Sequence, residues 1–497
     1  MRFTELTKSI TGCRVVNAND VEVTGIAYDS RKVKPGYIFV AMQGGSFDGH
    51  QFITSALDSG AVAIVAEREV QEALDRGVPY VVADNGRIAM GEIAAPFYDY
   101  PSRKIKLIGV TGTSGKTTVT HLIQSIFQTA GMKSGLIGTL GAKIDGEFIE
   151  TEHTTPESLD VQRILAQMVD MGAQVVAMEV SSHGLYEGRT IGCEFDCGVF
   201  TNIARDHLDF HITEEAYLDA KIILFRDLPK TSGKSFYAAI NLDDSKADKV
   251  IAASDGSVIT FGMDPKADVV ASDAKVTEKS VSFNMTGRGK SVPVRMSIGG
   301  AFNVYNALSA ASVGIALGLD LDTISKGLAK ATSVPGRFES VECGQDFGVI
   351  VDYAHTPDEL ENVLQTARTL TDKRLIAVFG CGGNRDKGKR PIMGKIGVDL
   401  ADLVVITSDN PRKEDPDAII KDILAGIPED KKSNVTVEPD RAQAICEAIN
   451  MAETGDLVVI AGKGHEDYQI FANRTIHFDD REQASHALEL RVKCCGL

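Results

Sequence analysis

The chain has 497 residues, 43% of them hydrophobic, and a formal net charge of −17 at pH 7. At about 150 residues per domain, this length predicts roughly three domains, and the hydrophobic content excludes a chain without folded cores. The excess of acidic side chains argues against broad nucleic-acid binding, which needs a basic face, but it permits small anionic substrates in a local basic pocket.

Nothing in the sequence predicts export or membrane insertion. The first ten residues, MRFTELTKSI, are polar, and no apolar run approaches the roughly 18 residues of a membrane span. The eight cysteines are scattered, and Cys193 and Cys197 lack a second ligand pair at zinc-finger spacing. We therefore expect a cytoplasmic, monomeric protein with reduced thiols.

The pattern of strands and helices predicts an α/β protein of three domains. Residues 1–100, with strand-like runs at 37–40 and 63–65, form a small N-terminal α/β domain. Residues 101–333 alternate apolar strands with amphipathic helices, which is typical of a mainly parallel sheet covered by helices.

Pro335 and Gly336 mark a linker before the third predicted domain, residues 334–497. There the strand candidates 349–351, 376–379, 404–407 and 458–461 alternate with helical stretches. This alternation predicts a Rossmann-like C-terminal domain.

The strongest local motif is IGVTGTSGKTT at residues 108–118. A strand precedes it and an amphipathic helix follows, so the glycines can turn backbone N–H groups toward phosphate oxygens. Val110 stands where the standard phosphate-loop pattern has Gly, and an ordinary glycine turn is the alternative. We expect nucleotide binding, with Lys116 on the phosphates and Thr117 or Thr118 on Mg²⁺. The residues involved are Gly112, Thr113, Ser114, Gly115, Lys116, Thr117 and Thr118.

The loop resembles that of the Mur ligase family, ATP-dependent enzymes that add amino acids to a UDP-linked muramoyl peptide. Family-like segments follow in chain order: HTTP at 153–156, EVSSH at 179–183, NIARDHLDFH at 202–211, Asn303 with Asn306, and DYAHTP at 352–357. The resemblance covers essentially the whole chain. It implies an N-terminal domain for the UDP end, a central ATPase domain and a C-terminal amino-acid domain.

Two C-terminal segments, GCGGNRD at 380–386 and DNPR at 409–412, are similar to acceptor motifs of the members that add the third peptide residue. The DNPR form is associated with meso-diaminopimelate, whose distal carboxylate an arginine can bind through two parallel bonds. A solvent-facing turn at 411–413 is the alternative. The resemblance implies acceptor contacts from Arg385, Asp409, Asn410, Pro411, Arg412, Gly462 and Glu466.

The resemblance also implies contacts to the muramoyl substrate from Ser30, Thr154, Thr155, Ser181 and Arg189. Glu187 stands where a related pattern has Gln, so we assign it no contact. Glu179 follows a strand-like run and is a natural Mg²⁺ ligand, unless it forms a salt bridge with a neighbouring helix.

By resemblance, His183 lies near a second Mg²⁺, Asn303 approaches the adenine, and Arg337 lies near the hinge and the ribose. Composition alone makes Lys221 a surface lysine, whereas the resemblance implies a buried, carbamylated lysine that binds Mg²⁺. The segment 206–211, with Asp206, His207, Asp209 and His211, has the spacing of a metal cluster. We favour a supporting turn at the active site over zinc.

Two other functions remain open. A folylpolyglutamate synthase could share the scaffold, although DNPR and the N-terminal domain argue against it. A non-enzymatic nucleotide switch would need no amino-acid pocket.

Overall fold

The computed structural model describes residues 1–44 and 48–495, with the side chains of Asp209 and of residues 492–495 left out. The chain divides into two compact units. The first comprises Met1–Ile203, His207–Thr260 and Ser312–Leu319, and the second comprises Ala204–Asp206, Phe261–Ala311 and the rest of the chain from Asp320. The boundaries of the three predicted domains remain a prediction.

The first unit begins with a sheet of the order β1-β5-β4-β3-β2, in which only β1 is antiparallel to its neighbour. Apolar side chains cover both faces, as expected for parallel strands. The elements are α1 Phe3–Thr7, β1 Arg14–Val16, β2 Gly25–Ala27, η1 Ser30–Lys32, β3 Tyr37–Val40, η2 Gly49–Phe52, α2 Ile53–Asp58, β4 Ala63–Ala66, α3 Gln71–Asp75, β5 Tyr80–Val82 and α4 Gly86–Phe97.

The same unit contains the strand order β12-β11-β6-β10-β7-β8-β9. Neighbours from β12 to β7 are parallel, and β7, β8 and β9 form an antiparallel edge. The elements are η3 Pro101–Lys104, β6 Lys106–Thr111, α5 Lys116–Thr129, β7 Ser134–Gly138, β8 Gly141–Ile144, β9 Glu147–Ile149, α6 Ser158–Asp170, β10 Val175–Glu179, α7 Ser182–Tyr186, β11 Cys197–Phe200, α8 Leu208–His211, α9 Glu214–Arg226, η4 Pro229–Thr231, β12 Tyr237–Asn241 and α10 Ala247–Ala253.

Local sequence explains the central elements of this sheet. Every residue of β6 except its first is buried, which fits a strand at the middle of a covered parallel sheet. Helix α5 buries Val119, Leu122, Ile123, Ile126 and Phe127 on one face, as its spacing predicts. The carboxyl ends of these parallel strands meet at one edge, where ligands usually bind.

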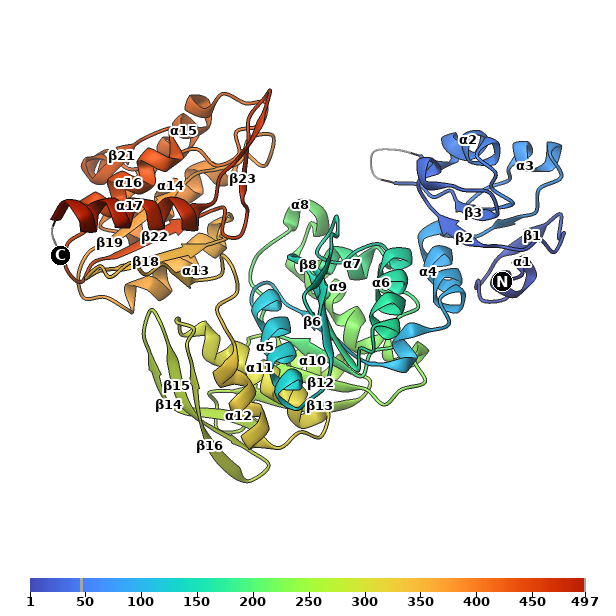
Figure 1. Ribbon diagram of the computed structural model, residues 1–497, viewed down its shortest axis with the longest axis horizontal. Coiled ribbons are helices and arrows are strands. Elements are labelled where there is room, and N and C mark those ends of the chain that lie inside the picture. The colour runs from blue at the N-terminus through green and yellow to red at the C-terminus, as the bar shows by residue number, and fades with distance from the viewer. Residues whose placement is uncertain (45–47, 496–497) are drawn as a thin grey trace. The chain divides into compact units, whose positions relative to one another are not determined.

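The second unit holds an antiparallel ribbon, β14-β15-β16, and a separate sheet of the order β17-β18-β22-β19-β20-β21. All pairs in that sheet are parallel except β17 with β18, and both faces are covered by helices (Figure 1). The predicted Rossmann-like pattern of alternating strands and helices is therefore confirmed. The antiparallel ribbon was not predicted, although β15 alternates buried apolar residues with more exposed polar ones, which is typical of a half-buried strand.

The remaining elements, in chain order, are β13 Ser257–Gly262, β14 Val269–Val276, β15 Val281–Gly287, β16 Lys290–Met296, α11 Phe302–Ala316, α12 Leu321–Lys330, β17 Glu339–Ser340, β18 Gly348–Asp352, α13 Pro357–Arg368, β19 Leu375–Phe379, α14 Lys389–Leu400, β20 Leu403–Ile406, α15 Pro416–Leu424, η5 Glu429–Asn434, β21 Val435–Val437, α16 Arg441–Met451, β22 Leu457–Ala461, β23 Tyr468–Ile470, β24 Thr475–His477 and α17 Asp480–Cys495.

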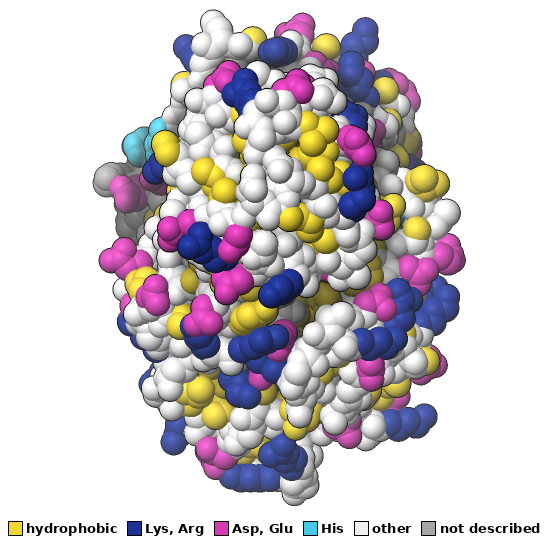
Figure 2. All heavy atoms as spheres, turned by 90° about the vertical axis from the view of Figure 1, so that its right-hand side faces the viewer, with side chains coloured by type: hydrophobic (Ala, Val, Ile, Leu, Met, Phe, Trp, Pro, Cys, Tyr) yellow, Lys and Arg dark blue, Asp and Glu magenta, His cyan; other side chains and the backbone are white. Residues whose placement is uncertain are grey.

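Surface charge is mixed in sign. On the face shown in Figure 2, acidic and basic side chains are interspersed, so the net negative charge does not gather into one patch there. Within the described residues, the helices fall short of the length and apolar character needed to cross a membrane.

Candidate active site

The predicted phosphate loop connects β6 to α5 in the first unit. Gly112 and Gly115 have φ values of 149° and 87°, which L side chains rarely adopt. A Cβ atom at Gly112 would also lie 1.9 Å from Thr201 Oγ1. Both glycines are therefore required by the backbone, as the motif predicts.

The loop is braced by the segment that follows β11. Asn202 accepts hydrogen bonds from the backbone N–H groups of Thr113 (2.9 Å) and Ser114 (3.1 Å). Lys116 Nζ donates to the carbonyls of Gly112 (2.9 Å) and Thr113 (2.8 Å), so the ammonium lies over its own loop. This places a cation where phosphate groups are expected.

Glu179, the last residue of β10, lies buried beside this loop. Its carboxylate accepts hydrogen bonds from Thr117 Oγ1 (3.1 Å), Thr139 Oγ1 (3.1 Å) and Thr139 N–H (2.9 Å). Its described contacts are thus with hydroxyl and amide donors rather than with a cation. A carboxylate and a hydroxyl of this kind fit Mg²⁺, which prefers oxygen ligands.

Lys221 is buried in α9, with 1% of its surface exposed. Its Nζ donates to the Gly112 carbonyl at 2.9 Å and lies 4.3 Å from the centre of the Tyr217 ring. Tyr217 OH in turn lies 3.1 Å from Thr113 Oγ1. The expectation of a surface lysine from composition is wrong, and the burial implied by the resemblance is confirmed.

His183 lies in a cluster of aromatic rings. Its ring centre is 4.1 Å from that of Phe210 and 4.7 Å from that of His207. Among the described residues, no group of three or more His, Cys, Asp or Glu side chains could hold a metal ion. The Asp209 side chain lies outside the described residues. Asp206 and His207 precede the short helix α8, Leu208–His211, and the predicted supporting turn stays a prediction.

Four residues predicted to contact the muramoyl substrate, here called the donor substrate, lie on loops beside Glu179. Thr155 Oγ1 donates to the Glu179 carbonyl at 3.0 Å and accepts from Ser181 N–H at 2.9 Å. Arg189 Nη1 donates to the Thr155 carbonyl at 3.0 Å. Thr154 Oγ1 lies 3.1 Å from Thr139 Oγ1.

Ser30 is far from these four residues in the sequence, at the first position of η1, a short helix between β2 and β3. Two residues earlier, Tyr28 OH donates to Asp160 on α6 at 2.7 Å. Burial, together with this carboxylate, raises the pKa of Tyr28. The hydroxyl therefore stays protonated and keeps the Ser30 segment attached to α6.

In the second unit, the predicted acceptor residues lie on three loops that follow β19, β20 and β22, which are adjacent strands. Asn410 Nδ2 donates to Glu466 Oε2 at 2.9 Å. Gly462 has a φ of 124°, and a Cβ there would lie 3.6 Å from Asp409 Oδ2. The structure thus brings Asp409, Asn410, Gly462 and Glu466 together at the carboxyl edge of the sheet.

Arg412 is half-buried and has a φ of 52°. Its Nη1 donates to the Gly383 carbonyl at 3.1 Å, so the turn is tied to the loop after β19. A Cβ at Gly383 would lie 1.9 Å from the Pro411 carbonyl, which shows how closely these two loops pack. Arg385, on the same loop as Gly383, is exposed.

The remaining predicted nucleotide residues also belong to the second unit. Asn303 is buried near the start of α11, where its Nδ2 donates to the Gly299 carbonyl at 2.6 Å. The Arg337 guanidinium lies 4.8 Å from the centre of the Tyr353 ring. Burial raises the pKa of Asp352, while the charge of Arg337 opposes that shift.

Three family descriptions match consecutive parts of the chain. The Mur ligase family catalytic domain matches residues 22–98, the Mur ligase middle domain residues 110–314, and the Mur ligase glutamate ligase domain residues 336–464. The chain is also 45% identical over 495 residues to the UDP-N-acetylmuramoyl-L-alanyl-D-glutamate--2,6-diaminopimelate ligase of Syntrophomonas wolfei, with 99% of this chain and 100% of that protein covered. The chain belongs to the Mur ligase family.

Other Mur ligases agree with this assignment. The protein of the same name from Geobacillus thermodenitrificans is 44% identical over 493 residues, covering 99% of this chain and 100% of the relative. A solved structure of a UDP-N-acetylmuramoyl-L-alanyl-D-glutamate--2,6-diaminopimelate ligase has 34% identity and a TM-score of 0.68, covering 94% of this chain and 95% of that one. The MurF ligase of Thermotoga maritima in complex with ADP, at 20% identity and a TM-score of 0.63, shares the fold, with 94% of this chain and 98% of that chain covered.

Sequence reasoning missed several buried cations in this Mur ligase, among them Lys463 and Arg441. Lys463 is fully buried, with Nζ 3.2 Å from Glu466 Oε2 and 3.9 Å from Asp409 Oδ1. Arg441 forms two 2.7 Å contacts with Asp480, and both side chains are 0% exposed. Lys463 could have been found from its place between Gly462 and Glu466, whereas no local signal links Arg441 to Asp480.

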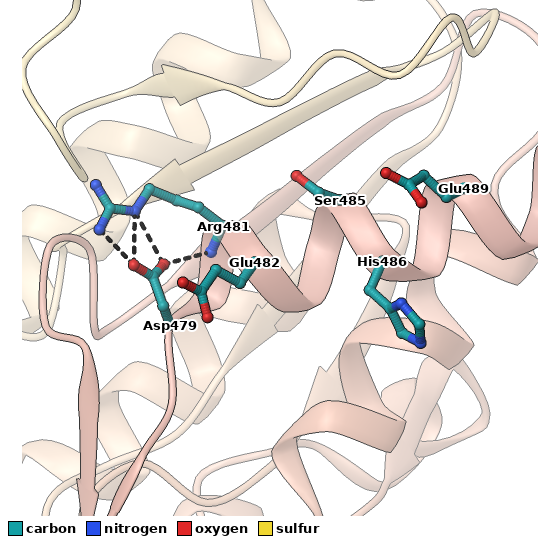
Figure 3. Close-up of a pocket in the computed structure, with 6 residues that line it drawn as sticks. All are labelled: Asp479, Arg481, Glu482, Ser485, His486 and Glu489. Carbon is teal, nitrogen blue, oxygen red and sulfur yellow. Dashed lines mark hydrogen bonds and ion pairs between the residues drawn. The ribbon is translucent and has the colours of Figure 1, made fainter.

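A surface hollow of about 480 Å³ lies along α17 of this Mur ligase. Figure 3 shows its lining residues, which come from the helix and the residue that precedes it: Asp479, Arg481, Glu482, Ser485, His486 and Glu489. None of the predicted site residues is among them. The hollow therefore has no part in the candidate active site.

Proposed function

We propose that this Mur ligase uses ATP to join meso-2,6-diaminopimelate to UDP-N-acetylmuramoyl-L-alanyl-D-glutamate, a step of peptidoglycan synthesis. The observation that carries the proposal is its similarity over nearly its whole length to relatives of that name. Two sheet edges support it, one with the phosphate loop and Glu179, the other with the DNPR segment. The substrates are small nucleotide-linked and amino-acid molecules, which fits a cytoplasmic enzyme.

The reaction has two steps. A carboxylate oxygen of the donor's D-glutamate attacks the γ-phosphorus of ATP, and the bond to the ADP oxygen breaks, which gives an acyl phosphate and ADP. The neutral amine of diaminopimelate then attacks the acyl carbon, loses a proton, and expels inorganic phosphate as the amide bond forms. Both steps gather negative charge, so fixed cations and N–H donors lower the barrier.

The chain's own groups meet this demand in the first unit. Residues Gly112–Thr118 hold the phosphates, with Lys116 as the positive charge. Thr154, Thr155, Ser181 and Arg189 hold the donor beside Glu179, and Ser30 holds its UDP end. Thr117 and Glu179 would hold Mg²⁺, which neutralises phosphate charge when bound, and His183 would serve a second such ion.

Lys221 is proposed to act as a carbamate. Its neutral amine would add to CO₂ and release one proton, and the carbamate oxygens would be available to hold Mg²⁺. Its burial supports this role, because a desolvated lysine is more readily neutral. Its 2.9 Å contact with the Gly112 carbonyl puts the amine at the phosphate loop.

Acceptor choice rests on the loops of the second unit. Arg412 and Arg385 would bind the distal carboxylate of diaminopimelate, and Asp409 with Glu466 would accept hydrogen bonds from its distal ammonium. Asn410, Pro411 and Gly462 shape the loop, while Asn303 and Arg337 serve the nucleotide. Loss of one charged contact of this kind costs about 1.5–3 kcal/mol, or roughly ten- to a hundredfold in kcat/KM.

The test is ADP release by the purified enzyme with each substrate present or omitted. We expect release to require ATP, Mg²⁺, the UDP-linked dipeptide and meso-diaminopimelate together, and mass spectrometry to find the tripeptide product. L-lysine, which lacks the distal carboxylate, should be a far poorer acceptor. ADP release that is unchanged when either the dipeptide or the amino acid is omitted would refute the ligase assignment.

A further inference from the structure

A ring of four charged side chains joins the N-terminal sheet's last helix to the donor residues. Each carboxylate divides its two oxygens between two guanidinium groups. Glu157 lies 3.3 Å from Arg87 Nε and 3.3 Å from Arg189 Nε. Glu187 lies 3.3 Å from Arg87 Nη1 and 2.6 Å from Arg189 Nη2.

The ring is well shielded from solvent, so its charges are weakly screened. The exposed fractions of the side chains are 22% for Arg87, 9% for Glu157, 12% for Arg189 and 22% for Glu187. Burial raises the pKa of Glu157, and the charges of Arg87 and Arg189 oppose that shift. The two arginines and two glutamates balance, so the ring as a whole is neutral.

Arg87 enters this ring from a helix that has little room to move. It is the second residue of α4, and Gly91 lies one turn further along the same face. A Cβ at Gly91 would lie 2.8 Å from Ile191, and one at Gly192 would lie 2.8 Å from the Gly91 carbonyl. Helix α4 therefore packs directly on the segment that follows Arg189, and it also contacts α6 (Figure 1).

The ring bears on the position of Arg189. The Arg189 guanidinium donates a hydrogen bond from Nη1 to the Thr155 carbonyl at 3.0 Å and forms ion pairs with Glu157 and Glu187. Both glutamates are also paired with Arg87, which belongs to the domain proposed to bind the UDP end. Glu187, to which the sequence assigned no contact, thus has a partner on each side.

We propose that Arg87 is a positioning residue for the UDP-linked donor, acting through Glu157 and Glu187 on Arg189; this rests on the proposed function. Without Arg87, two carboxylates would share one guanidinium, and the ring would carry a net negative charge where an anionic donor must bind. Donor binding is then weakened twice, by repulsion and by a less ordered Arg189. ATP and the amino acid do not meet this ring, so their binding should be spared.

The experiment compares Arg87→Gln with a matched control, Arg76→Gln, on the same domain. Arg76 pairs with Asp58 at 2.7 Å, but these side chains are 42% and 62% exposed. For Arg87→Gln we expect the donor KM to rise about tenfold, as for a partly buried charge pair, with kcat within about twofold and the KM for ATP unchanged. Arg76→Gln should match the wild type.

Two further variants separate positioning from general damage to the fold. Arg87→Lys keeps the charge but cannot reach both carboxylates with separate nitrogens, so its donor KM should be intermediate. The double variant Arg87→Gln/Glu187→Gln restores neutrality, and its donor KM should return to within about threefold of the wild type. Titration calorimetry with the UDP-linked dipeptide alone should rank the dissociation constants of these variants in the same order as their donor KM values.

The proposal is overturned if Arg87→Gln leaves the donor KM within twofold, if it raises the KM for ATP equally, or if the double variant is worse than the single one. Wild-type enzyme that releases no ADP with the dipeptide would instead refute the proposed function, and calorimetry would still report whether Arg87 affects binding of the dipeptide.

Discussion

The buried ion pair between Arg441 and Asp480 yields a prediction with a calculable size. Replacing Asp480 with Asn keeps the volume but removes the carboxylate that makes two 2.7 Å contacts with the guanidinium. Removal of one partner from a fully buried pair costs about 3–5 kcal/mol. At about 2–4 °C per kcal/mol, the thermal midpoint of Asp480→Asn should fall by about 10 °C.

The same change should weaken acceptor binding. Arg441 Nη1 donates to the Ser408 carbonyl at 3.3 Å and Nη2 to the Ala461 carbonyl at 3.0 Å. These carbonyls directly precede Asp409 and Gly462, so the ion pair fixes the start of two acceptor loops. We expect the KM for diaminopimelate to rise about tenfold, the effect of about 1.4 kcal/mol, while the KM for ATP stays constant.

The assay is a thermal melt followed by circular dichroism, together with steady-state ADP release. Asp58→Asn is the control, because Asp58 meets Arg76 at the same 2.7 Å but on the surface, where such pairs contribute about 0–1 kcal/mol. A thermal midpoint for Asp480→Asn within 2 °C of that of Asp58→Asn would refute the reasoning, because the buried ion pair would then stabilise the protein no more than the exposed one.

Other consequences of the geometry can be measured independently. Gly112→Ala should abolish nucleotide binding in calorimetry, because its Cβ would lie 1.9 Å from a neighbouring hydroxyl; Gly131→Ala, at φ 80° with nothing within 4 Å, should retain it. Thr139→Val removes one donor from the Glu179 carboxylate, and the Mg²⁺ concentration for half-maximal activity should rise about tenfold or more. Burial, with nearby arginine charges, lowers the pKa of His465 to about 4. The unfolded chain binds this proton near pH 6.5, so acidification toward pH 4 favours unfolding, and His465→Gln should lose less stability than the wild type in melts over this range.

Much of the fold could be predicted because its signals are local. The run 108–118 contains a buried strand, two glycines and an amphipathic helix in sequence, and each is where the pattern places it. The strand candidates at 349–351, 376–379, 404–407 and 458–461 correspond to β18, β19, β20 and β22, and every predicted end lies within one residue of the observed one. Covered parallel strands are continuous apolar runs, which makes them easy to find.

The site could be predicted only in part, because its geometry depends on contacts between distant residues. Lys221 has acidic neighbours in its helix, and its burial became predictable only through the family resemblance. Arg441 and Asp480 are 39 positions apart in the sequence, and Arg87 and Glu187 are 100 positions apart. Such pairs leave no periodic trace in a single sequence. The proposed roles of the donor, acceptor and metal residues accordingly stay predictions.

The close approach of Gly336 to Gly464 limits how this enzyme can be altered. A Cβ at Gly336 would lie 2.1 Å from the Gly464 carbonyl carbon, so the two backbones cross without any intervening side chain. One of the two segments leads out of the linker, and the other leads to Glu466. Any larger residue at Gly336 must push the segment around Gly464 aside. An insertion or probe intended for the linker therefore belongs upstream of Pro335, where we expect it to leave amino-acid selection intact.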